Sequence, residues 1–121
     1  MLGTNDSKTI NWRHDGYEQA IRTMVMEIRN AQPDAKLFLL LPPAAFEDKI
    51  GEIAFGIRDE VIRDEILPIL KNIAEEFSLK TIDLYALTGA HPEYFMDGVH
   101  PNKAGNEAIA LEISESLRKF L

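Results

Sequence analysis

The stretch that decides the fold runs from Leu37 to Pro43 and reads Leu-Phe-Leu-Leu-Leu-Pro-Pro. A continuous apolar run of this length is typical of a β-strand that is covered on both faces, as in parallel sheets. The two prolines lack the N–H donor of a strand ladder, so the strand is predicted to end at Leu41. A strand of this kind needs helices on both sides of its sheet, and the sequence around it has helical patterns.

One helix is predicted before this strand, over residues 15–31. Asp15 is the expected N-cap, and Glu18 three residues later completes a capping-box pattern. Pro33 is expected to stop the helix. Apolar residues recur along one face at spacings of three and four: Tyr17, Ile21, Met24, Ile28 and Ala31.

A second helical pattern follows the strand, over residues 57–77. Pro68 lies inside it, so we expect a kink or two abutting helices. Residues 44–56, which precede this pattern, fit either a short helix with loops or a flap over a pocket. The apolar residues of the pattern are Ile57, Val61, Ile62, Ile66, Ile69, Leu70, Ile73 and Phe77.

The rest of the chain continues the alternation of strands and helices. Residues 79–84 are predicted to form a strand and residues 85–101 a loop, and Asn102 is the expected N-cap of a last helix. Residues 1–3 are predicted to be the end of a further strand. This order predicts one α/β domain with a parallel sheet and helices on its faces.

The composition excludes several functions. The chain has 121 residues, of which 45% are hydrophobic and 27% charged, as in an ordinary small globular domain. A net charge of −7 argues against nucleic acid or an anionic membrane surface as a partner. The absence of cysteine excludes disulfides, thiolate metal sites and a cysteine nucleophile.

Functional residues are expected at one edge of the sheet. Asn5, the Pro42-Pro43 segment and residues 85–101 each directly follow a predicted strand. The carboxyl ends of parallel strands meet at one edge, and α/β folds hold their ligands there. We therefore expect these three segments to lie together.

The clearest chemical motif is Asp97-Gly98-Val99-His100-Pro101-Asn102. An imidazole acts as a general base when a carboxylate holds its other ring nitrogen and so fixes its tautomer and orientation. A spacing of three residues across a glycine-containing turn can place Asp97 against His100. The same spacing also fits a turn in which both side chains bond only to the backbone.

Two segments together resemble the SGNH hydrolases, the family of GDSL-like lipases and acylhydrolases. The string Asp97–Asn102, followed by Gly105, resembles the last block of that family, and Leu2–Asp6 (Leu-Gly-Thr-Asn-Asp) resembles its third block. The segments between them also fit the family pattern, and their sequence is most similar to the branch of carbohydrate O-acetylesterases. These further segments are Asn11-Trp12, Pro42-Pro43 and His91–Phe95.

The resemblance implies both a fold and a site. The fold is a flavodoxin-like three-layer α/β/α domain. Asp97 would orient the imidazole, His100 would be the general base, and Asn5 would donate to the oxyanion hole. The implied activity is that of a serine esterase acting on short acyl groups such as acetyl, with a small ester or an acetylated carbohydrate as substrate. No cofactor is expected, and no metal, because the three histidines show no ligand spacing.

The first two blocks of the family have no counterpart in this sequence. The first would bring the nucleophilic serine in Gly-Asp-Ser, and none of Ser7, Ser78, Ser114 and Ser116 fits that role. We therefore expect residues 1–121 to be the C-terminal part of a single SGNH hydrolase domain, with its first strands missing, no nucleophile and no activity by itself. The exposed strand edge is then expected to be covered by an N-terminal fragment or by a second copy in a homodimer.

Two other functions stay open at this point. One is a non-catalytic α/β module that self-associates through its exposed sheet edge. The other is a flavodoxin-like binder of a phosphorylated ligand, which ranks last because the chain has no glycine-rich phosphate loop. The sequence leaves open the acyl group, the alcohol and the compartment, including a secreted or periplasmic one.

Overall fold

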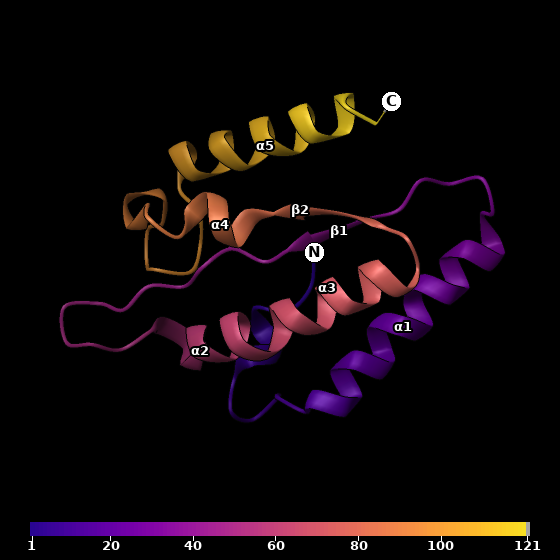
Figure 1. Cartoon of the computed structure of the whole chain (residues 1–121). Coiled ribbons are helices and arrows are strands. Elements are labelled where there is room, and N and C mark those ends of the chain that lie inside the picture. Colours follow the sequence, from indigo (N-terminus) through magenta and orange to yellow (C-terminus); the bar gives the residue numbers. More distant parts are fainter. Residues whose placement is uncertain (121) are drawn as a thin grey trace.

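The computed structural model describes residues 1–120, which form three layers (Figure 1). Two parallel strands make the middle layer and pair with Phe38 opposite Lys80 and Leu41 opposite Asp83. Two long helices cover one face of this sheet and a third covers the other. The predicted α/β fold with a parallel sheet is therefore confirmed. The elements are β1 (Phe38–Leu41), β2 (Lys80–Asp83), α1 (His14–Ala31) and α3 (Leu67–Glu76) on one face, and α5 (Lys103–Arg118) on the other.

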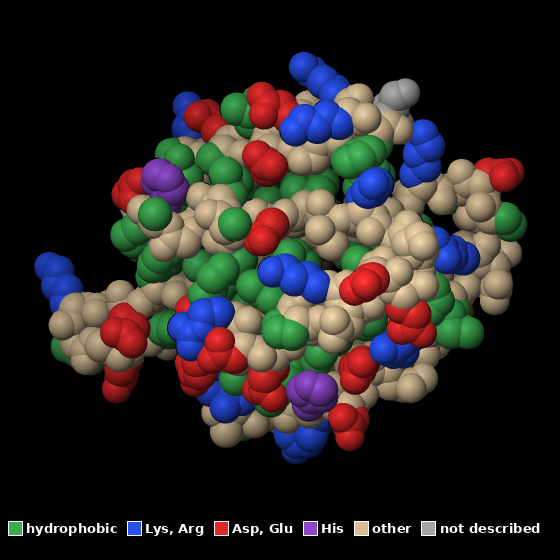
Figure 2. Space-filling view, viewed as in Figure 1, with side chains coloured by type: hydrophobic (Ala, Val, Ile, Leu, Met, Phe, Trp, Pro, Cys, Tyr) green, Lys and Arg blue, Asp and Glu red, His purple; other side chains and the backbone are tan. Residues whose placement is uncertain are grey.

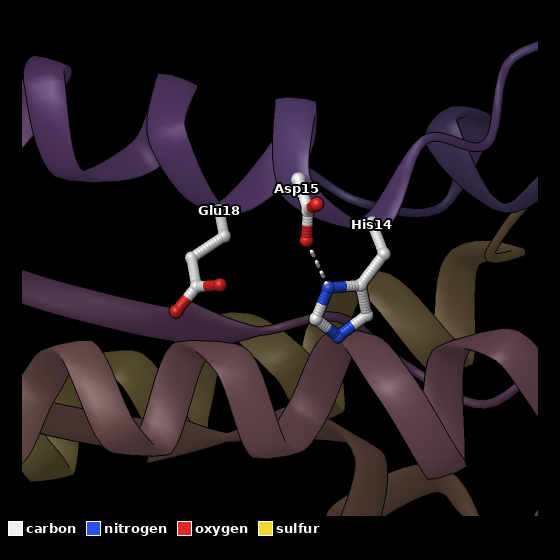
Figure 3. A group of neighbouring side chains, drawn as sticks. All are labelled: His14, Asp15 and Glu18. Carbon is white, nitrogen blue, oxygen red and sulfur yellow. Dashed lines mark hydrogen bonds and ion pairs between the residues drawn. The ribbon is translucent and has the colours of Figure 1, made fainter.

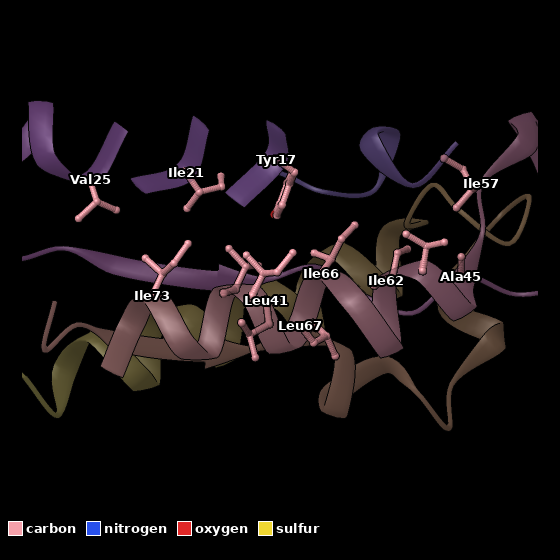
Figure 4. Packing of buried hydrophobic residues seen from close by; sticks show 13 residues of the cluster. Tyr17, Ile21, Val25, Leu41, Ala45, Ile57, Ile62, Ile66, Leu67 and Ile73 are labelled. Carbon is pink, nitrogen blue, oxygen red and sulfur yellow. The ribbon is translucent and has the colours of Figure 1, made fainter. Parts of the chain in front are cut away.

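The hydrophobic core lies between β1, α1 and α3 (Figure 4). Leu41 ends β1 at 1% exposure, and Ile62, Ile66 and Ile73 are fully buried. The buried face of α1 consists of Tyr17, Ile21 and Val25, whereas Met24 and Ile28 of the predicted stripe are exposed. The apolar run and the helical spacings thus locate the core, with the face of α1 rotated slightly from the prediction.

The N-cap of the first helix lies two residues earlier than predicted. Arg13 occupies the N-cap position, and no side chain caps the helix. The prediction that Asp15 caps it is wrong, because Asp15 already lies in the first helical turn. Its carboxylate interacts with His14 Nδ1 at 3.3 Å and lies where negative charge favours the helix dipole.

The helical region around Pro68 has the irregularity that the proline predicted. A short helix, α2 (Asp59–Val61), continues into a π-helical segment (Ile62–Ile66) and then into α3. Pro68 cannot donate a backbone hydrogen bond, and a widened turn accommodates that missing donor without breaking the helix. Residues 44–56, which fitted two interpretations, contain a single 3₁₀ turn, Ala54–Gly56, within a loop.

Two further predictions of local structure were wrong. Residues 85–101 are not all loop: α4 (Leu84–Thr88) follows β2 directly, and Pro92–Tyr94 form a 3₁₀ turn. Asp83 caps α4 by accepting a hydrogen bond from the Ala86 N–H at 2.9 Å. Residues 1–3 are not in a strand, because the Leu2 carbonyl bonds to the Tyr17 hydroxyl at 2.9 Å and joins no ladder.

The surface carries acidic and basic side chains mixed together on the face that Figure 2 shows. Apolar side chains are visible between them. Met24, Met26 and Ile28 of α1 are among the exposed large apolar residues. Across residues 1–120, no helix has both the length and the apolar character needed to cross a membrane.

Candidate functional site

The structure brings Asp97 and His100 into direct contact. Asp97 Oδ2 lies 2.7 Å from His100 Nδ1, while Asp97 Oδ1 accepts hydrogen bonds from the Val99 and His100 backbone N–H groups at 2.9 and 2.7 Å. One carboxylate therefore holds both the turn and the ring. With Nδ1 occupied, Nε2 is the ring nitrogen left to exchange protons, which is the geometry of an oriented general base.

Electrostatics favour the ionised form of this carboxylate. The hydrogen bond from the His100 backbone N–H is the largest cause, followed by the one with the imidazole, and together they lower the pKa of Asp97 to about 2. The carboxylate is consequently charged at neutral pH and stabilises an imidazolium when His100 takes a proton. Both side chains are accessible to solvent, with His100 at 59% and Asp97 at 33% exposure.

Gly98 makes this turn possible. Its φ of 82° lies in the left-handed region, and a Cβ atom there would lie 2.2 Å from the Phe46 carbonyl oxygen. In return, the Phe46 N–H donates to the Gly98 carbonyl at 2.9 Å. The turn after β2 is thus held against the segment that follows β1.

The segment that follows β1 is itself fixed by three successive backbone donors. Ala44 N–H donates to the hydroxyl of the fully buried Thr88 at 3.1 Å, and Ala45 N–H donates to Asp59 Oδ1 at 2.9 Å. Phe46 N–H is the third donor. The other oxygen of Asp59 accepts from the Tyr85 hydroxyl at 2.7 Å, and burial, followed by this hydrogen bond, raises the pKa of Tyr85. Sequence reasoning missed Thr88 and Asp59, since nothing in a linear pattern links them to residues 44–46.

Asn102 connects the turn to the last helix, as predicted. Its side-chain oxygen accepts from the Gly105 N–H at 3.0 Å, and its amide nitrogen donates to the Glu93 carbonyl at 2.7 Å. Gly105 is buried, and a Cβ there would lie 2.3 Å from the Tyr94 carbonyl oxygen. The helix start therefore gives His100 a rigid base on its C-terminal side.

Asn5 lies on a separate 3₁₀ turn, Asn5–Ser7, and its side chain is exposed. Within residues 1–120 no hydrogen bond joins its amide to Asp97 or His100. The turn is nevertheless tied to the site through Ser7, which accepts from the Arg58 N–H at 3.1 Å. Arg58 follows the turn Ala54–Gly56, where the Phe55 ring contacts His100 with 5.2 Å between ring centroids. Residues 54–58 thus contact both the turn Asn5–Ser7 and His100, and the position of the Asn5 amide beside His100 stays a prediction.

The serines lie in places that do not suit a nucleophile. Ser7 is fully buried, and its hydroxyl donates to the Thr4 carbonyl at 2.7 Å while accepting from Arg58. Ser78 lies just before β2, at the end opposite to the candidate site, and Ser114 and Ser116 lie in α5. The absence of a serine nucleophile from residues 1–121 stays a prediction.

The remaining histidines are engaged separately. His91 Nδ1 lies 2.7 Å from Glu93 Oε1, and its ring stacks on Tyr94. His14, Asp15 and Glu18 bring one ligand atom each within 4.8 Å of one another at the start of α1 (Figure 3). Asp15 is fully exposed and Glu18 already pairs with Arg22, so this group is an ordinary charged helix start. The three histidines do not converge on one point.

Known proteins resemble this chain in sequence and in fold. The acetylxylan esterase of Xylanibacter ruminicola is 32% identical over 136 residues, which cover 97% of this chain and 27% of that protein. The multidomain esterase of Ruminococcus flavefaciens is 26% identical over 125 residues, which cover all of this chain and 15% of that protein. The chain therefore spans roughly a quarter or less of the length of these relatives.

Solved structures of low identity share the fold. A peptidoglycan O-acetylesterase aligns with a TM-score of 0.79 and 20% identity over 98% of this chain and 35% of its own. The esterase domain of the zebrafish ZfL2-1 ORF1 protein aligns with a TM-score of 0.74 and 23% identity over 98% of this chain and 66% of its own. A GDSL-like lipase from Bacteroides thetaiotaomicron VPI-5482 aligns with a TM-score of 0.72 and 23% identity over 99% of this chain and 60% of its own.

Family membership is shown by the sequence itself. The family model described as GDSL-like lipase/acylhydrolase matches residues 1–108, a span that includes both segments on which the resemblance rests. With a match over nearly the whole chain and the α/β fold in place, the chain belongs to the GDSL-like lipase/acylhydrolase family.

Proposed function

We propose that this chain is the C-terminal part of one hydrolase domain that cleaves short acyl groups, such as acetyl, from carbohydrate esters. The observation that carries the proposal is the 2.7 Å contact between Asp97 and His100 in a chain of this family. The name of the acetylxylan esterase relative supports the acetyl group and the carbohydrate. The substrate is then a small neutral ester, and the negative net charge argues against nucleic acid as a partner.

The proposed reaction needs a serine that lies outside residues 1–121. The serine Oγ attacks the ester carbonyl carbon, and His100 Nε2 takes the Oγ proton. The bond to the alcohol oxygen breaks, His100 gives the proton to that oxygen, and the acyl group stays on the serine. His100 then removes a proton from water, which attacks the acyl-serine and releases the carboxylic acid, while the proton returns to Oγ.

In this mechanism Asp97 and Asn5 stabilise charge. Asp97 stabilises the imidazolium in each step. The Asn5 amide donates a hydrogen bond to the carbonyl oxygen when it becomes negative, and one such donor typically contributes about 3–4 kcal/mol to lowering the barrier. Neither residue substitutes for the nucleophile, so we propose that the 121-residue chain has no esterase activity by itself.

Hydrolysis of a chromogenic acetate ester tests this proposal. The chain by itself is expected to match its His100→Ala variant at the background rate. A version extended by the in-frame sequence upstream of Met1, if that sequence encodes Gly-Asp-Ser, is expected to turn over the ester and to lose activity on His100→Ala. Turnover by the 121-residue chain that His100→Ala abolishes would contradict the proposed inactivity.

A second candidate function rests on a different observation. An apolar groove of about 140 Å³ lies between α1 and the edge of β1 that does not pair with β2, and it is lined by Leu2, Ile21, Met24, Val25, Leu37 and Leu39 among others. An open strand edge beside apolar side chains favours pairing with another strand. A non-catalytic module would use this edge for a homodimer, whereas a hydrolase would cover it with an N-terminal fragment.

Analytical ultracentrifugation separates these two possibilities. The self-associating module is expected to sediment as a soluble dimer at micromolar concentration. A monomer at that concentration would contradict self-association. Dimer formation that an added N-terminal fragment displaces would favour the hydrolase.

A further inference from the structure

An exposed aromatic residue lies against the proposed catalytic histidine. The Phe55 ring meets the His100 ring edge to face, with an interplanar angle of 83° and 5.2 Å between the ring centroids. Phe55 is nevertheless 58% exposed, so the contact with His100 does not bury the ring in the core. The ring is therefore available to a molecule that approaches His100.

The backbone holds this ring in an unfavourable conformation. Phe55 has φ 63° and ψ 15°, the left-handed region that bulky side chains rarely adopt, and Gly56 follows with φ 70°. Such strain is unfavourable and tends to persist at binding or catalytic sites. Burial of the ring does not compensate for this strain, since the ring stays mostly exposed.

A partly apolar hollow adjoins this site through Ala54 and Asp97, the sequence neighbour of Phe55 and the partner of His100. Ala54, Phe46, Phe95, Met96 and Asp97 line a hollow of about 430 Å³, which lies within the range of about 300–1,000 Å³ of small-molecule sites. Met96, which directly precedes Asp97, is 74% exposed. Two exposed apolar side chains thus flank the Asp97–His100 pair.

The chemistry of the proposed reaction says which part of a substrate would lie here. The imidazole that takes the nucleophile's proton must also deliver it to the leaving alcohol oxygen, so the alcohol lies next to His100. A side chain in contact with the imidazole is therefore closer to the alcohol than to the acyl group. A flat aromatic ring offers an apolar face for the C–H groups of a sugar ring.

We propose that Phe55 is a specificity-determining residue whose ring binds the sugar of a neutral O-acetylated glycoside while the ester lies at His100. This inference rests on the proposed function and adds the residue that selects the alcohol. Three carboxylates, Glu47, Asp48 and Asp97, line the hollow with one cation, Lys49, so the excess of negative charge would disfavour an anionic sugar. The interaction needs no nucleophile, so it can be measured on the 121-residue chain.

Titration followed by NMR tests the inference. The probes are methyl tri-O-acetyl-β-xylopyranoside and, as an acetate ester without a sugar ring, glycerol triacetate. The glycoside is expected to shift the ring signals of Phe55 and His100. Phe55→Asn, which tolerates the left-handed conformation and removes the ring, is expected to weaken glycoside binding about tenfold, and Phe55→Tyr is expected to retain it.

Controls separate this inference from the proposed function. Ile50→Asn changes an exposed apolar residue of the same loop and should leave glycoside binding unchanged, and an unshifted His100 Nδ1 proton shows that the turn is intact. Glycoside binding at His100 that Phe55→Asn does not weaken would overturn only the role of Phe55. Equal weakening for glycerol triacetate would overturn the assignment to the sugar. No shift at His100 with either ester would overturn the proposed function as well.

Discussion

The two turns that carry the proposed catalytic groups are built differently. In the turn Asp97–His100 the two side chains bind each other, and one carboxylate also binds two backbone N–H groups. In the turn Asn5–Ser7 the fixed side chain is Ser7, which is buried, whereas Asn5 is exposed and only its backbone carbonyl accepts a side-chain bond, from Asn11. In the first turn, residues of the turn itself orient the side chains. The second turn is held by a hydrogen bond from Arg58, 51 positions away from Ser7.

This difference explains what a short motif can encode. Six consecutive residues suffice to orient an imidazole, because the partners are local. The position of one turn relative to the other depends on residues 44–46 and 54–58, which belong to neither turn. Substitutions that affect one turn and spare the other therefore test the comparison.

The largest effect is expected for Gly98→Ala. An alanine Cβ would lie 2.2 Å from the Phe46 carbonyl oxygen and would also be strained at φ 82°. The combined cost is expected to be about 2–4 kcal/mol of unfolding free energy, measured by urea denaturation. The His100 Nδ1 proton should also lose its hydrogen-bonded shift, because the turn must open.

Gly51→Ala is the matched control for this prediction. Gly51 has φ 83°, and only the end of the Glu47 side chain lies as near as 4.0 Å. Its substitution carries the conformational cost without the clash, about 1–2 kcal/mol. If both variants lose the same stability, then contact with Phe46 does not hold the turn.

A smaller effect is expected for Ser7→Ala, which acts on the other turn. The variant removes the hydroxyl of the buried Ser7 and leaves the half-buried Arg58 N–H without its partner, at a cost of about 1–3 kcal/mol. Amide signals around Asn5 should shift, while the His100 Nδ1 proton should not. Ser114→Ala in α5 is the exposed control, and it is expected to change the unfolding free energy by less than about 0.5 kcal/mol. A His100 signal that moves with Ser7→Ala would show that the two turns are coupled.

Asn102→Ala tests the base of the first turn. The variant removes the N-cap of α5 and the bond to the Glu93 carbonyl, and it should cost about 1 kcal/mol of unfolding free energy. Asn106→Ala, one turn further along α5, removes only a 3.4 Å contact to the Pro101 carbonyl and should cost less. Equal losses for the two variants would show that the cap contributes nothing.

The sequence predicts those parts of this molecule in which the partners are close along the chain. The apolar run of β1, the caps of Asn102 and the Asp97–His100 spacing all belong to this kind. The helix α4 was missed, although Asp83 three residues before Ala86 is a local cap signal that could have revealed it. Asp15 was misplaced as a cap because the helix starts early enough to move the N-cap two residues back, to Arg13.

The remaining features depend on contacts across long separations. Thr88 and Asp59 hold the segment after β1 from 44 and 14 positions away, and no periodicity indicates such a bond. The left-handed conformation of Phe55 is also invisible in the sequence, because the residue type argues against it. The segments of the site could thus be named in advance, but the residues that position them could not.

The smallest expected effect is on the pH dependence of stability, and it concerns Asp97 alone. The pKa of Asp97 is held at about 2, below its ordinary value of 3.8, so the folded state binds this proton more weakly than the unfolded state. Ionised Asp97 therefore stabilises the fold fully above about pH 4, and the contribution is lost as the pH falls through about pH 2. Asp97→Asn lacks this contribution. The difference in unfolding free energy between the wild-type chain and this variant should be constant near neutral pH and shrink between about pH 4 and about pH 2, in urea titrations at a series of pH values.

Asp34→Asn, at an exposed carboxylate outside both turns, is the matched control for that titration. If the difference for Asp97→Asn is the same at about pH 2 as at neutral pH, the charge of Asp97 does not hold the turn. The backbone N–H groups of Val99 and His100 would then hold the turn equally well with a neutral acceptor. The backbone geometry of the turn, and not the charge of Asp97, would orient the His100 ring. A shrinking difference places that orientation in the carboxylate itself, the group that the proposed mechanism requires to be charged.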